Sequence, residues 1–403
     1  MTSVTERIEA APPTVRDVPH IDTPPPYVEL GERDGIARIE LPSGHEAVHL
    51  TSYRDVMTIL GDATASRAEC NVVGGPSFMP TIWAPEVLIN LDQPVHGRMR
   101  KFIAQDFSAK GSERLRPIVE RAVDERIEAL VRGEAEPELI GSFFSVVPSH
   151  VVCELLGIPL ERRAWMHELG RTIQIADKHD IPGIAAAWEE LFGYVVDHVR
   201  GDVPRDETAL TATYMARGAE ADPPLDDVDV RGIVMGIVLG GDNNIVTMAA
   251  KTAFVALARP AIWDRLVEDP SKVDALIEEV LRLMPLGTPG TFPRLLKRDL
   301  ETEHGTLPEG TVVYPDVVRA NRDPSVFPDP EHIRLDRPPT RHLQFGYGMH
   351  HCMGAAMTRL ELQTILGRLV EAFPTLRLST EPADLPWWFG TGLRRPQVLP
   401  VRW

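Results

Sequence analysis

Apolar residues recur at intervals of three and four along much of the chain, which is the spacing of one face of an α-helix. Five segments carry this pattern most clearly, and each is expected to be a helix: residues 115–130, 186–200, 226–258, 271–283 and 355–372. Strand-like alternation is shorter and falls in two places, residues 36–50 and 300–318, the second with a Pro308-Glu309-Gly310 turn. The pattern predicts a mainly α fold with small β-sheets.

The helix expected from residue 226 has no proline before Pro260 and would be roughly 50 Å long at about 1.5 Å per residue. Residues 228–239 are apolar nearly all round, which indicates burial on every side. A run of small and polar residues then interrupts the pattern: Gly240, Gly241, Asp242, Asn243 and Asn244. Paired glycines are unfavourable inside a helix. The run therefore indicates either a kink with internal hydrogen bonds or a close approach of a bulky ligand to the backbone.

The composition is that of an ordinary globular protein, with 403 residues of which 43% are hydrophobic and 25% charged. No glycine- or serine-rich linker, charge block or internal repeat divides the chain after the first thirty residues. We therefore expect a flexible segment over residues 1–24 and one large domain over residues 25–403.

The net charge changes which partners can be expected. With 42 Lys and Arg against 59 Asp and Glu, the formal charge is −17, so the surface repels nucleic acid and anionic lipid. The longest apolar run, residues 232–241, is about half of the roughly 20 residues that cross a bilayer. The first thirty residues lack the basic flank and apolar stretch of a secretory signal. These features predict a soluble cytoplasmic protein that binds neither nucleic acid nor membrane.

Three cysteines, Cys70, Cys153 and Cys352, are widely separated and lack CxxC spacing, which argues against disulfides and a structural zinc site. The first two are expected to be inert core residues. Cys352 differs because it sits between Gly348 and Gly354 at the start of an expected helix, where unpaired backbone N–H groups favour a thiolate that suits a metal. A cysteine protease would need a histidine base and an oxyanion site, which this loop does not show as clearly.

This loop resembles the haem-binding signature of the cytochrome P450 superfamily. The signature is Phe, two residues, Gly, one residue, Arg or His, one residue, Cys, one residue and Gly. Its positions are filled here by Phe345, Gly348, His350, Cys352 and Gly354. The resemblance extends from about residue 25 onward. It implies a long helix over the haem, haem b as the cofactor, the Cys352 thiolate as the iron ligand, and a monooxygenase or oxidative coupling activity.

Two further groups of residues match the same family. Glu279 and Arg282 resemble its ExxR motif, which with Arg337 is implied to form a buried structural cluster. The residues implied to bind the haem propionates are His96, Arg100, Arg294 and His350. A solvated surface charge is the simpler interpretation of any one of these four alone, but all four in register favour a haem site.

The long helix departs from the family at its centre, where relatives carry an acid followed by threonine. Here these positions are Asn243 and Asn244, preceded by Asp242. The acid and alcohol ordinarily deliver protons during oxygen activation, and asparagine cannot exchange a proton at neutral pH. Three outcomes follow. Asn244 positions water while the substrate or Asp242 completes the relay, the enzyme couples substrate radicals without inserting oxygen, or oxygen activation is lost.

The resemblance also implies which residues line the distal side of the pocket, several of them aromatic. They are Phe78, Met79, Trp83, Ile237, Asn244, Thr288, Thr291, Trp388 and Phe389. Core packing explains the aromatic members equally well. As pocket residues, they favour an apolar and flat substrate.

Electrons are expected from a partner, because the chain has no flavin or nicotinamide fingerprint. Soluble bacterial relatives use a ferredoxin and its reductase. The resemblance places six basic residues near the proximal side of the haem: Arg98, Arg100, Lys101, Arg337, Arg341 and Arg359. Their local charge would steer docking, and scattered surface charge is the alternative.

These features together predict an oxidoreductase of bacterial secondary metabolism that activates dioxygen. It is expected to hydroxylate or couple a small aromatic or peptide-derived natural product, such as an aromatic cyclodipeptide. The alternative is a catalytically silent haem-binding helper for a partner enzyme, which the paired asparagines keep open.

Overall fold

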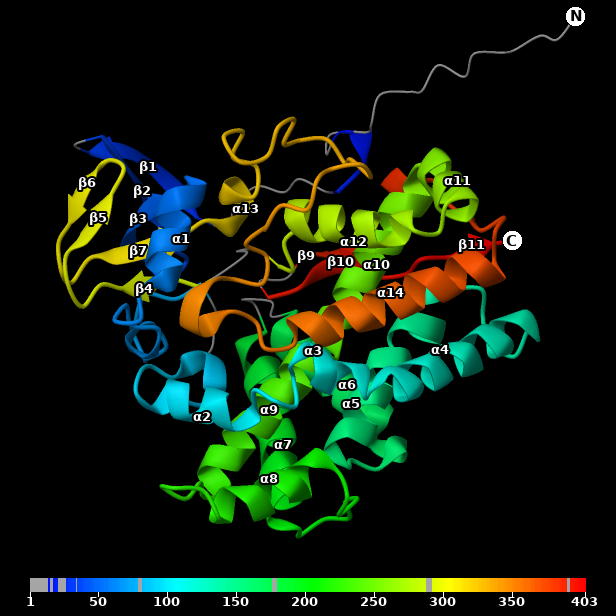
Figure 1. Ribbon diagram of the computed structural model, residues 1–403, viewed down its shortest axis with the longest axis horizontal. Helices are drawn as coiled ribbons and strands as arrows, with labels where there is room; N and C mark the ends of the chain where they lie inside the picture. The colour runs from blue at the N-terminus through cyan, green and yellow to red at the C-terminus, as the bar shows by residue number, and fades with distance from the viewer. Residues whose placement is uncertain are drawn as a thin grey trace, which may run out of the picture.

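Helices form the larger part of the fold, and strands gather mainly at one end (Figure 1). The computed structural model describes residues 14, 17–20, 27–33, 35–78, 82–175, 180–287, 292–389 and 392–403. The segment predicted to be flexible, residues 1–24, lies largely outside these residues. The helices are α1 Tyr53–Gly61, α2 Val95–Ile103, α3 Ala109–Glu113, α4 Arg116–Val131, α5 Val147–Leu156, α6 Arg163–Gln174, α7 Ile181–Arg200, α8 Leu210–Ala219, α9 Asp227–Gly241, α10 Asn243–Ala258, α11 Pro260–Glu268, α12 Lys272–Leu283, α13 Val317–Ala320 and α14 Ala355–Ala372.

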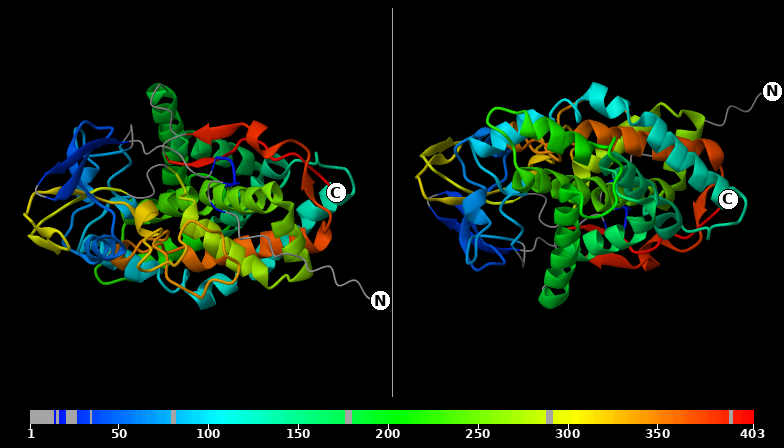
Figure 2. Two further views of the ribbon diagram at one scale, coloured as in Figure 1. Left: turned by 90° about the horizontal axis from the view of Figure 1, so that it is seen from above. Right: turned by 90° about the horizontal axis from the view of Figure 1, so that it is seen from below.

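The strands are β1 Val28–Arg33, β2 Ile36–Glu40, β3 Glu46–Leu50, β4 Arg294–Leu295, β5 Leu300–Thr302, β6 Gly305–Leu307, β7 Val312–Pro315, β8 Arg377–Leu378, β9 Trp387–Phe389, β10 Arg394–Pro396 and β11 Val401–Arg402. Five of them form one sheet in the order β1-β2-β3-β7-β4. Its two halves join where β3 and β7 pair in parallel, with Val48 opposite Val313. The two stretches predicted to form strands therefore meet in space, beside the helical body (Figure 2).

The helices predicted from apolar spacing are present with small shifts at their ends. α4 and α12 each begin one residue later than predicted, and α14 has the predicted ends. α7 begins at Ile181 instead of residue 186. Its earlier start has a local cause, because the Asp180 side chain accepts a hydrogen bond from the Gly183 N–H and Pro182 fits the first turn of a helix. The prediction of a mainly α fold with small β-sheets is confirmed.

The long central helix is broken at the polar run. α9 ends at Gly241 and α10 begins at Asn243, because Asp242 has φ −102° and ψ −92°, away from helical values. Both polar side chains bond to one residue of α6: Asp242 pairs with His167 Nδ1 at 2.9 Å, and Asn243 Nδ2 donates to the His167 carbonyl at 3.0 Å. The break is thus a kink with internal hydrogen bonds, and the long helix predicted over residues 226–258 is present as two successive segments that meet at Asp242.

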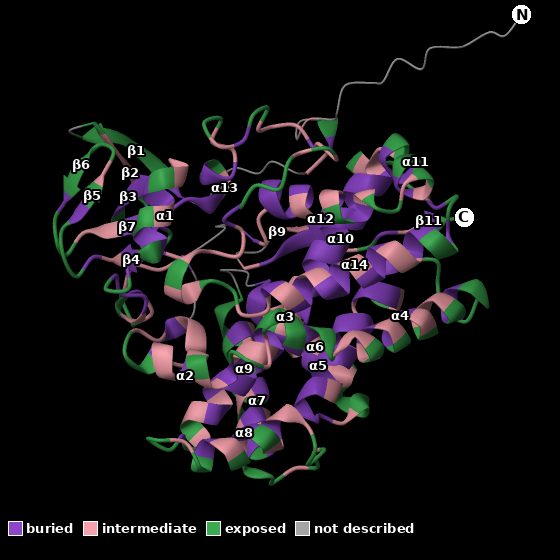
Figure 3. Cartoon of the chain, in the orientation of Figure 1, coloured by how far each residue is buried: buried purple, intermediate pink, exposed green. Residues whose placement is uncertain are grey.

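α10 is buried along nearly its whole length, as Figure 3 shows for the centre of the molecule. By length and composition the segment Asp227–Ala258 could cross a membrane, but 78% of its most apolar window is buried inside the protein. The helix packs against α5, α6, α12 and α14, so the core is built around it. The prediction of a buried helix is confirmed.

Phe254 in α10 provides a test of this central position. It is fully buried, and its ring lies 5.2 Å from the ring of Trp387 in β9. Phe254→Ala removes this contact and leaves a cavity, so the free energy of unfolding is expected to fall by about 3–5 kcal/mol in urea denaturation. Val131→Ala, at an exposed position at the end of α4, is the control and should change it by less than about 0.5 kcal/mol. Equal losses in the two variants would contradict this view of the core.

Candidate active site

A cavity of about 360 Å³ lies between the loop that precedes α14 and the break between α9 and α10. Its volume falls within the range of small-molecule and cofactor sites, roughly 300–1,000 Å³. Beyond the missing Cβ of Gly240 the space is open, so a ligand can approach the backbone there. The two walls are formed by His350, Cys352 and Gly354 on the loop side and by Gly240, Gly241 and Asn244 on the helix side.

The loop that carries Cys352 adopts a conformation that requires glycine. Gly348 has φ +67°, and a Cβ there would lie 2.4 Å from the carbonyl oxygen of Leu60 in α1. The Cys352 N–H donates to the Phe345 carbonyl at 2.7 Å, which closes the loop around the glycine. Gly354 follows as the residue before α14. The family-like residues of the loop therefore place Cys352 on the cavity wall.

Cys352 is packed within the protein, and its solvent-accessible surface faces the cavity. Burial raises the pKa of its thiol, while the Gly354 N–H and the charges of Arg100 and Arg359 act in the opposite direction. Without a bound cation, desolvation thus has the larger effect on the pKa of this thiol, and the Gly354 N–H at the helix start the smaller one. A coordinated metal cation would remove the thiol proton outright.

Five basic side chains gather at or behind one wall of the cavity. The rings of His96 and His350 lie 4.2 Å apart, and both line the cavity with Arg100. Arg294 lies close behind, since its charge acts on both histidines. These four were predicted from the sequence. Arg67 was not: it is 4% exposed, and no motif marks it in the sequence.

Little negative charge offsets this basic cluster. Burial and the surrounding arginines lower the pKa of His350 to about 2 and that of His96 to about 4. Among the residues that the structure describes, His96 Nδ1 and His350 Nε2 have no hydrogen-bond partner. Asp92 is a nearby carboxylate, but it already accepts from the Ser66 hydroxyl at 2.5 Å and the Arg67 N–H at 2.8 Å.

The basic cluster fits a ligand with carboxylate groups. Buried donors without partners are costly, and carboxylates accept strong hydrogen bonds from them. With a cysteine on the same wall, the donor set matches a haem, whose propionates are carboxylates and whose iron takes a thiolate ligand.

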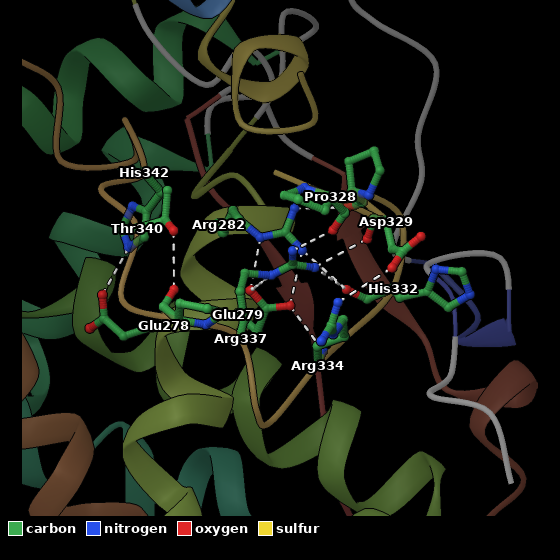
Figure 4. Close-up of polar contacts among 12 residues, drawn as sticks. Glu278, Glu279, Arg282, Pro328, Asp329, His332, Arg334, Arg337, Thr340 and His342 are labelled. Carbon is green, nitrogen blue, oxygen red and sulfur yellow. Dashed lines mark hydrogen bonds and ion pairs between the residues drawn. The ribbon is translucent and has the colours of Figure 1, made fainter. Parts of the chain in front are cut away.

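A buried ion-pair cluster ties α12 to the segment that leads to the cysteine loop (Figure 4). Glu279 accepts two hydrogen bonds from Arg282, at 2.9 and 3.0 Å, and a third from Arg337 at 2.9 Å. Both arginines also donate to the carbonyl of His332, at 3.1 and 3.2 Å. No side chain of the three is more than 7% exposed. The three residues that the resemblance groups together are thus in direct contact.

The structure separates the two asparagines. Asn243 is fully buried and bonds to α6 as described above, whereas Asn244 lines the cavity. In the described part of the chain, Asn244 Oδ1 has no hydrogen-bond partner. Asp242 is 2% exposed and lies one residue outside the lining, since the lining includes Gly241 and Asn244 but not Asp242.

Of the residues predicted to line the substrate pocket, Trp83 and Ile237 lie on the cavity wall. Phe78 does not, because it packs with residues of β2, β3 and β7 in a separate buried cluster. Trp388 also lies away from the cavity lining. The guanidinium group of Arg171 in α6 lies over its ring, 5.0 Å from the ring centroid. Met79, Thr288, Thr291 and the side chain of Phe389 are outside the described part of the chain.

Several residues on the wall had no sequence signal. Apolar spacing locates a helix but does not say which face borders a cavity, and a buried polar residue inside a helix has no motif. These residues are Phe107, Gln174, Ile233, Leu286, Phe292 and Glu361.

The basic residues predicted near the proximal side differ in environment. Arg337 is not a surface charge, because it belongs to the buried ion-pair cluster. Arg341 and Arg359 line a second cavity, of about 1140 Å³, which borders the Cys352 loop and includes His351. Lys101 is exposed.

The ion-pair cluster predicts a large effect of one substitution. Glu279→Gln leaves two guanidinium groups buried without a carboxylate, so the free energy of unfolding is expected to fall by about 3–5 kcal/mol in chemical denaturation. Glu268→Gln, at the end of α11, is the control. That side chain is 55% exposed, and the loss should stay below about 1 kcal/mol. Similar losses at the two positions would count against the cluster as a structural element.

The two cavity histidines predict a pH dependence of stability. Their pKa values are lowered in the folded protein, so below the ordinary value of about 6.5 the unfolded chain binds more protons. Stability of the haem-free protein is therefore full above this value and falls as the pH drops toward the lowered pKa values. Denaturation midpoints across this range measure the slope, and the double variant His96→Gln/His350→Gln should reduce it. An unchanged slope would exclude the two histidines as its cause.

Comparisons with known proteins agree with this site. The Cytochrome P450 family model matches residues 269–398. Nocardicin C N-oxygenase from Nocardia uniformis subsp. tsuyamanensis is 32% identical over 391 residues, 95% of this chain and 96% of that protein. Mycinamicin IV hydroxylase/epoxidase from Micromonospora griseorubida is 30% identical over 383 residues, 94% of each. The solved structure of cytochrome P450mel 107F1 with biaryl coupling reactivity has a TM-score of 0.83 and 28% identity, covering 91% of this chain and 93% of that chain. Because the similarity spans nearly the whole of both relatives, the chain belongs to the cytochrome P450 family.

Proposed function

We propose that this cytochrome P450 hydroxylates or oxidatively couples a small aromatic or peptide-derived natural product in bacterial secondary metabolism. One observation carries the proposal: a single cavity is bordered by Cys352, by His96, Arg100 and His350 of the basic cluster, and by the broken central helix. Two relatives support the substrate class, since they are named for acting on mycinamicin IV and nocardicin C.

In the proposed site, Cys352 would ligate the iron of haem b. The residues that would bind the propionates are His96, Arg100, Arg294 and His350, and we add Arg67 to them. When bound, a thiolate-ligated haem supplies the oxidising chemistry that amino-acid side chains lack. Gly354 lies on the cavity wall, where the missing Cβ lets the backbone pass close to a ligand, while Gly348 lets the loop pass close to α1.

The cavity wall favours an aromatic substrate with a carbonyl group. Its apolar part consists of Trp83, Ile233, Ile237, Leu286 and Phe292. Trp83 is stacked on Trp188, with ring centroids 6.0 Å apart, which fixes the plane of its indole ring. Gln174 lines the same cavity, is 5% exposed, and has a side-chain N–H group without a partner among the described residues. A carbonyl of an aromatic cyclodipeptide would accept that hydrogen bond.

Both proposed reactions fit this wall and have counterparts among the relatives. One relative is named for N-oxygenation, one for hydroxylation and epoxidation, and the solved structure for biaryl coupling. Asn244 keeps a hydrogen-bond acceptor at the cavity, so it can still position water. The catalytically silent helper has no comparable support, because the thiol, the basic cluster and the ion-pair cluster are all retained.

We propose a ferredoxin and its reductase as the electron source, and the cytoplasm as the location. Arg341 and Arg359 line the second cavity beside the Cys352 loop, so positive charge lies near the proposed iron ligand. An acidic ferredoxin would be attracted there and repelled elsewhere by the net charge of −17. Docking would therefore be confined to this face.

Cys352→Ser tests the proposed iron ligand. The reduced parent protein under carbon monoxide is expected to show the long-wavelength Soret band of a thiolate-bound haem, and the variant is expected to lose it in absorption spectra. Cys153→Ser, at a buried position away from the cavity lining, should keep the band. A parent protein without haem, or a band that survives the loss of Cys352, would contradict the proposal.

Turnover then separates the two reactions. The holoenzyme, supplied with ferredoxin, reductase, reduced nicotinamide and a set of aromatic cyclodipeptides, should consume the nicotinamide and form product in mass spectra. Under isotopically heavy dioxygen, label in the product indicates insertion, and an unlabelled dimer indicates coupling. A normal carbonyl spectrum with no consumption on any substrate would favour the helper protein instead.

A further inference from the structure

Lys251 is a buried amine to which the proposed function gives no role. It lies in α10 and is fully buried. Among the residues that the structure describes, its hydrogen bonds go to main-chain carbonyls and it forms no ion pair with a carboxylate. Burial, and then the charge of Arg394, lower the pKa of Lys251 well below its ordinary value. An ammonium ion without a counter-charge is costly in such a place, so the neutral amine is favoured.

Two main-chain carbonyls accept the N–H groups of this amine. Lys251 Nζ donates to the carbonyl of Pro285 and to that of Leu286, the second at 3.1 Å. A neutral amine has two N–H groups, so both are satisfied. These two residues follow the end of α12, which packs directly against α10 (Figure 1), and Leu286 lines the cavity. Lys251 therefore ties the central helix to a loop of the cavity wall.

The same loop contacts a second segment of the wall, the one that precedes β10. The Leu286 carbonyl also accepts a hydrogen bond from the Arg394 N–H at 3.1 Å. The two loops pack so closely that a Cβ on Gly287 would lie 1.9 Å from the carbonyl oxygen of Gly392. Gly392 lines the cavity as well. The Leu286 carbonyl thus joins Lys251 to two loops of the wall.

This close packing continues to the end of α6. A Cβ on Gly392 would lie 2.2 Å from the carbonyl oxygen of Gln174, the last residue of that helix. The side chain of Gln174 lines the same cavity. Because no side chain lies between these backbone segments to adjust, one of them cannot shift without displacing the next. A movement of the loop at Leu286 would therefore also displace the wall at Gln174.

The place of Lys251 on α10 shows how it reaches this wall. It follows Asn244 by seven residues, which is close to two helical turns, so both side chains lie on the same face of the helix. Asn244 lines the cavity, whereas Lys251 lies outside the lining. Its effect on a bound molecule is therefore indirect, through the loops that it holds.

Stability alone does not explain a lysine at this position. Replacement of buried charged groups by apolar side chains of similar volume often leaves stability unchanged or raises it. Methionine has nearly the length of lysine, adapts to irregular gaps and needs no hydrogen-bond partner. An amine that is retained where an apolar side chain would be more stable points to a function at the adjoining wall.

We propose that Lys251 is a positioning residue that fixes the shape of the substrate cavity by holding the carbonyls of Pro285 and Leu286. Its two hydrogen bonds fix the loop after α12. The packing of Gly287 against Gly392 then fixes the loop before β10. The wall thus presents a rigid surface to a flat ring, and the lysine contributes to the selection of substrates. The inference rests on the function proposed above.

Azole binding to the holoenzyme tests this role without a known substrate. Imidazole and 4-phenylimidazole both bind haem iron through a ring nitrogen and shift the Soret band, and the phenyl ring of the second is expected to pack on the wall. Lys251→Met should weaken the binding of 4-phenylimidazole by about fivefold or more and keep that of imidazole within about twofold of the parent. Lys251→Gln keeps an NH₂ group and should recover part of the loss. A parent-like ratio of the two dissociation constants in Lys251→Met overturns the proposal.

Two controls separate positioning from folding. Thr252→Val removes a buried hydroxyl group whose hydrogen bond, to the Met248 carbonyl at 2.7 Å, stays within α10, so both azole affinities should be kept. In urea denaturation, Lys251→Met should have a midpoint no lower than that of the parent. A lower midpoint, a variant that does not fold, or an equal loss of affinity in Thr252→Val would reduce the lysine to a structural group and reject its positioning role.

A double variant tests whether Lys251 acts through its loop. Leu286→Ala removes the side chain that this loop places on the wall. Combined with Lys251→Met, it should weaken 4-phenylimidazole by less than the product of the two single effects, because both changes act on the same surface. Single effects that multiply would show that the lysine acts elsewhere.

The outcomes distinguish this inference from the proposed function. A parent-like azole ratio in Lys251→Met, together with a normal carbonyl spectrum, rejects the role of the lysine and leaves the enzyme assignment intact. A parent protein that shows no thiolate-type carbonyl band rejects the proposed function itself.

Discussion

Buried positive charge beside a cysteine is the constraint on which the rest of this structure depends. Arg67 and Arg294 are 4% and 6% exposed, and they surround two histidines that burial holds neutral. The protein stabilises part of this charge with main-chain carbonyls: Arg294 donates to Phe292 and Pro293, each at 3.1 Å. Neutral carbonyls satisfy hydrogen bonds but do not cancel charge. An anionic ligand would therefore complete the site, and its binding would add to the stability of the fold.

The scaffold around this charge is built from elements far apart in the sequence. The cysteine loop rests against α1 through the close approach of Gly348 to Leu60. The ion-pair cluster of Glu279, Arg282 and Arg337 fixes the chain that leads into the loop, and α14 continues from it through the core. The opposite wall is the α9–α10 break, held by α6. Each wall thus has contacts of its own, and the helices α10 and α14 that continue from the two walls also pack directly against each other.

Apolar periodicity predicted the long amphipathic helices well because their burial follows from their own sequence. α14 has the predicted ends, and α4 and α12 differ by one or two residues. The cysteine loop was also predictable, since its glycines have local backbone reasons that a motif records. The positions of Arg67, Glu361 and His167 at the cavity or at the helix break were not predictable, because they arise only when separate helices and loops come together. Phe78 is the opposite case. It was predicted to line the substrate pocket, but its side chain packs with residues of the sheet in a separate buried cluster.

The thiol of Cys352 shows a second limit of local reasoning. A helix start lowers a thiol pKa through dipoles of a few residues, whereas desolvation depends on every element packed around it, and here desolvation dominates. The same balance acts on Glu361, nine residues further on, where burial and the charge of Asp242 raise the pKa of the carboxyl group well above its ordinary value. Because one core encloses both groups, a charged side chain in this cavity is stable only beside a group of opposite charge. Asparagine at the helix break suits such a region, because its amide group forms hydrogen bonds without adding a charge to the cavity.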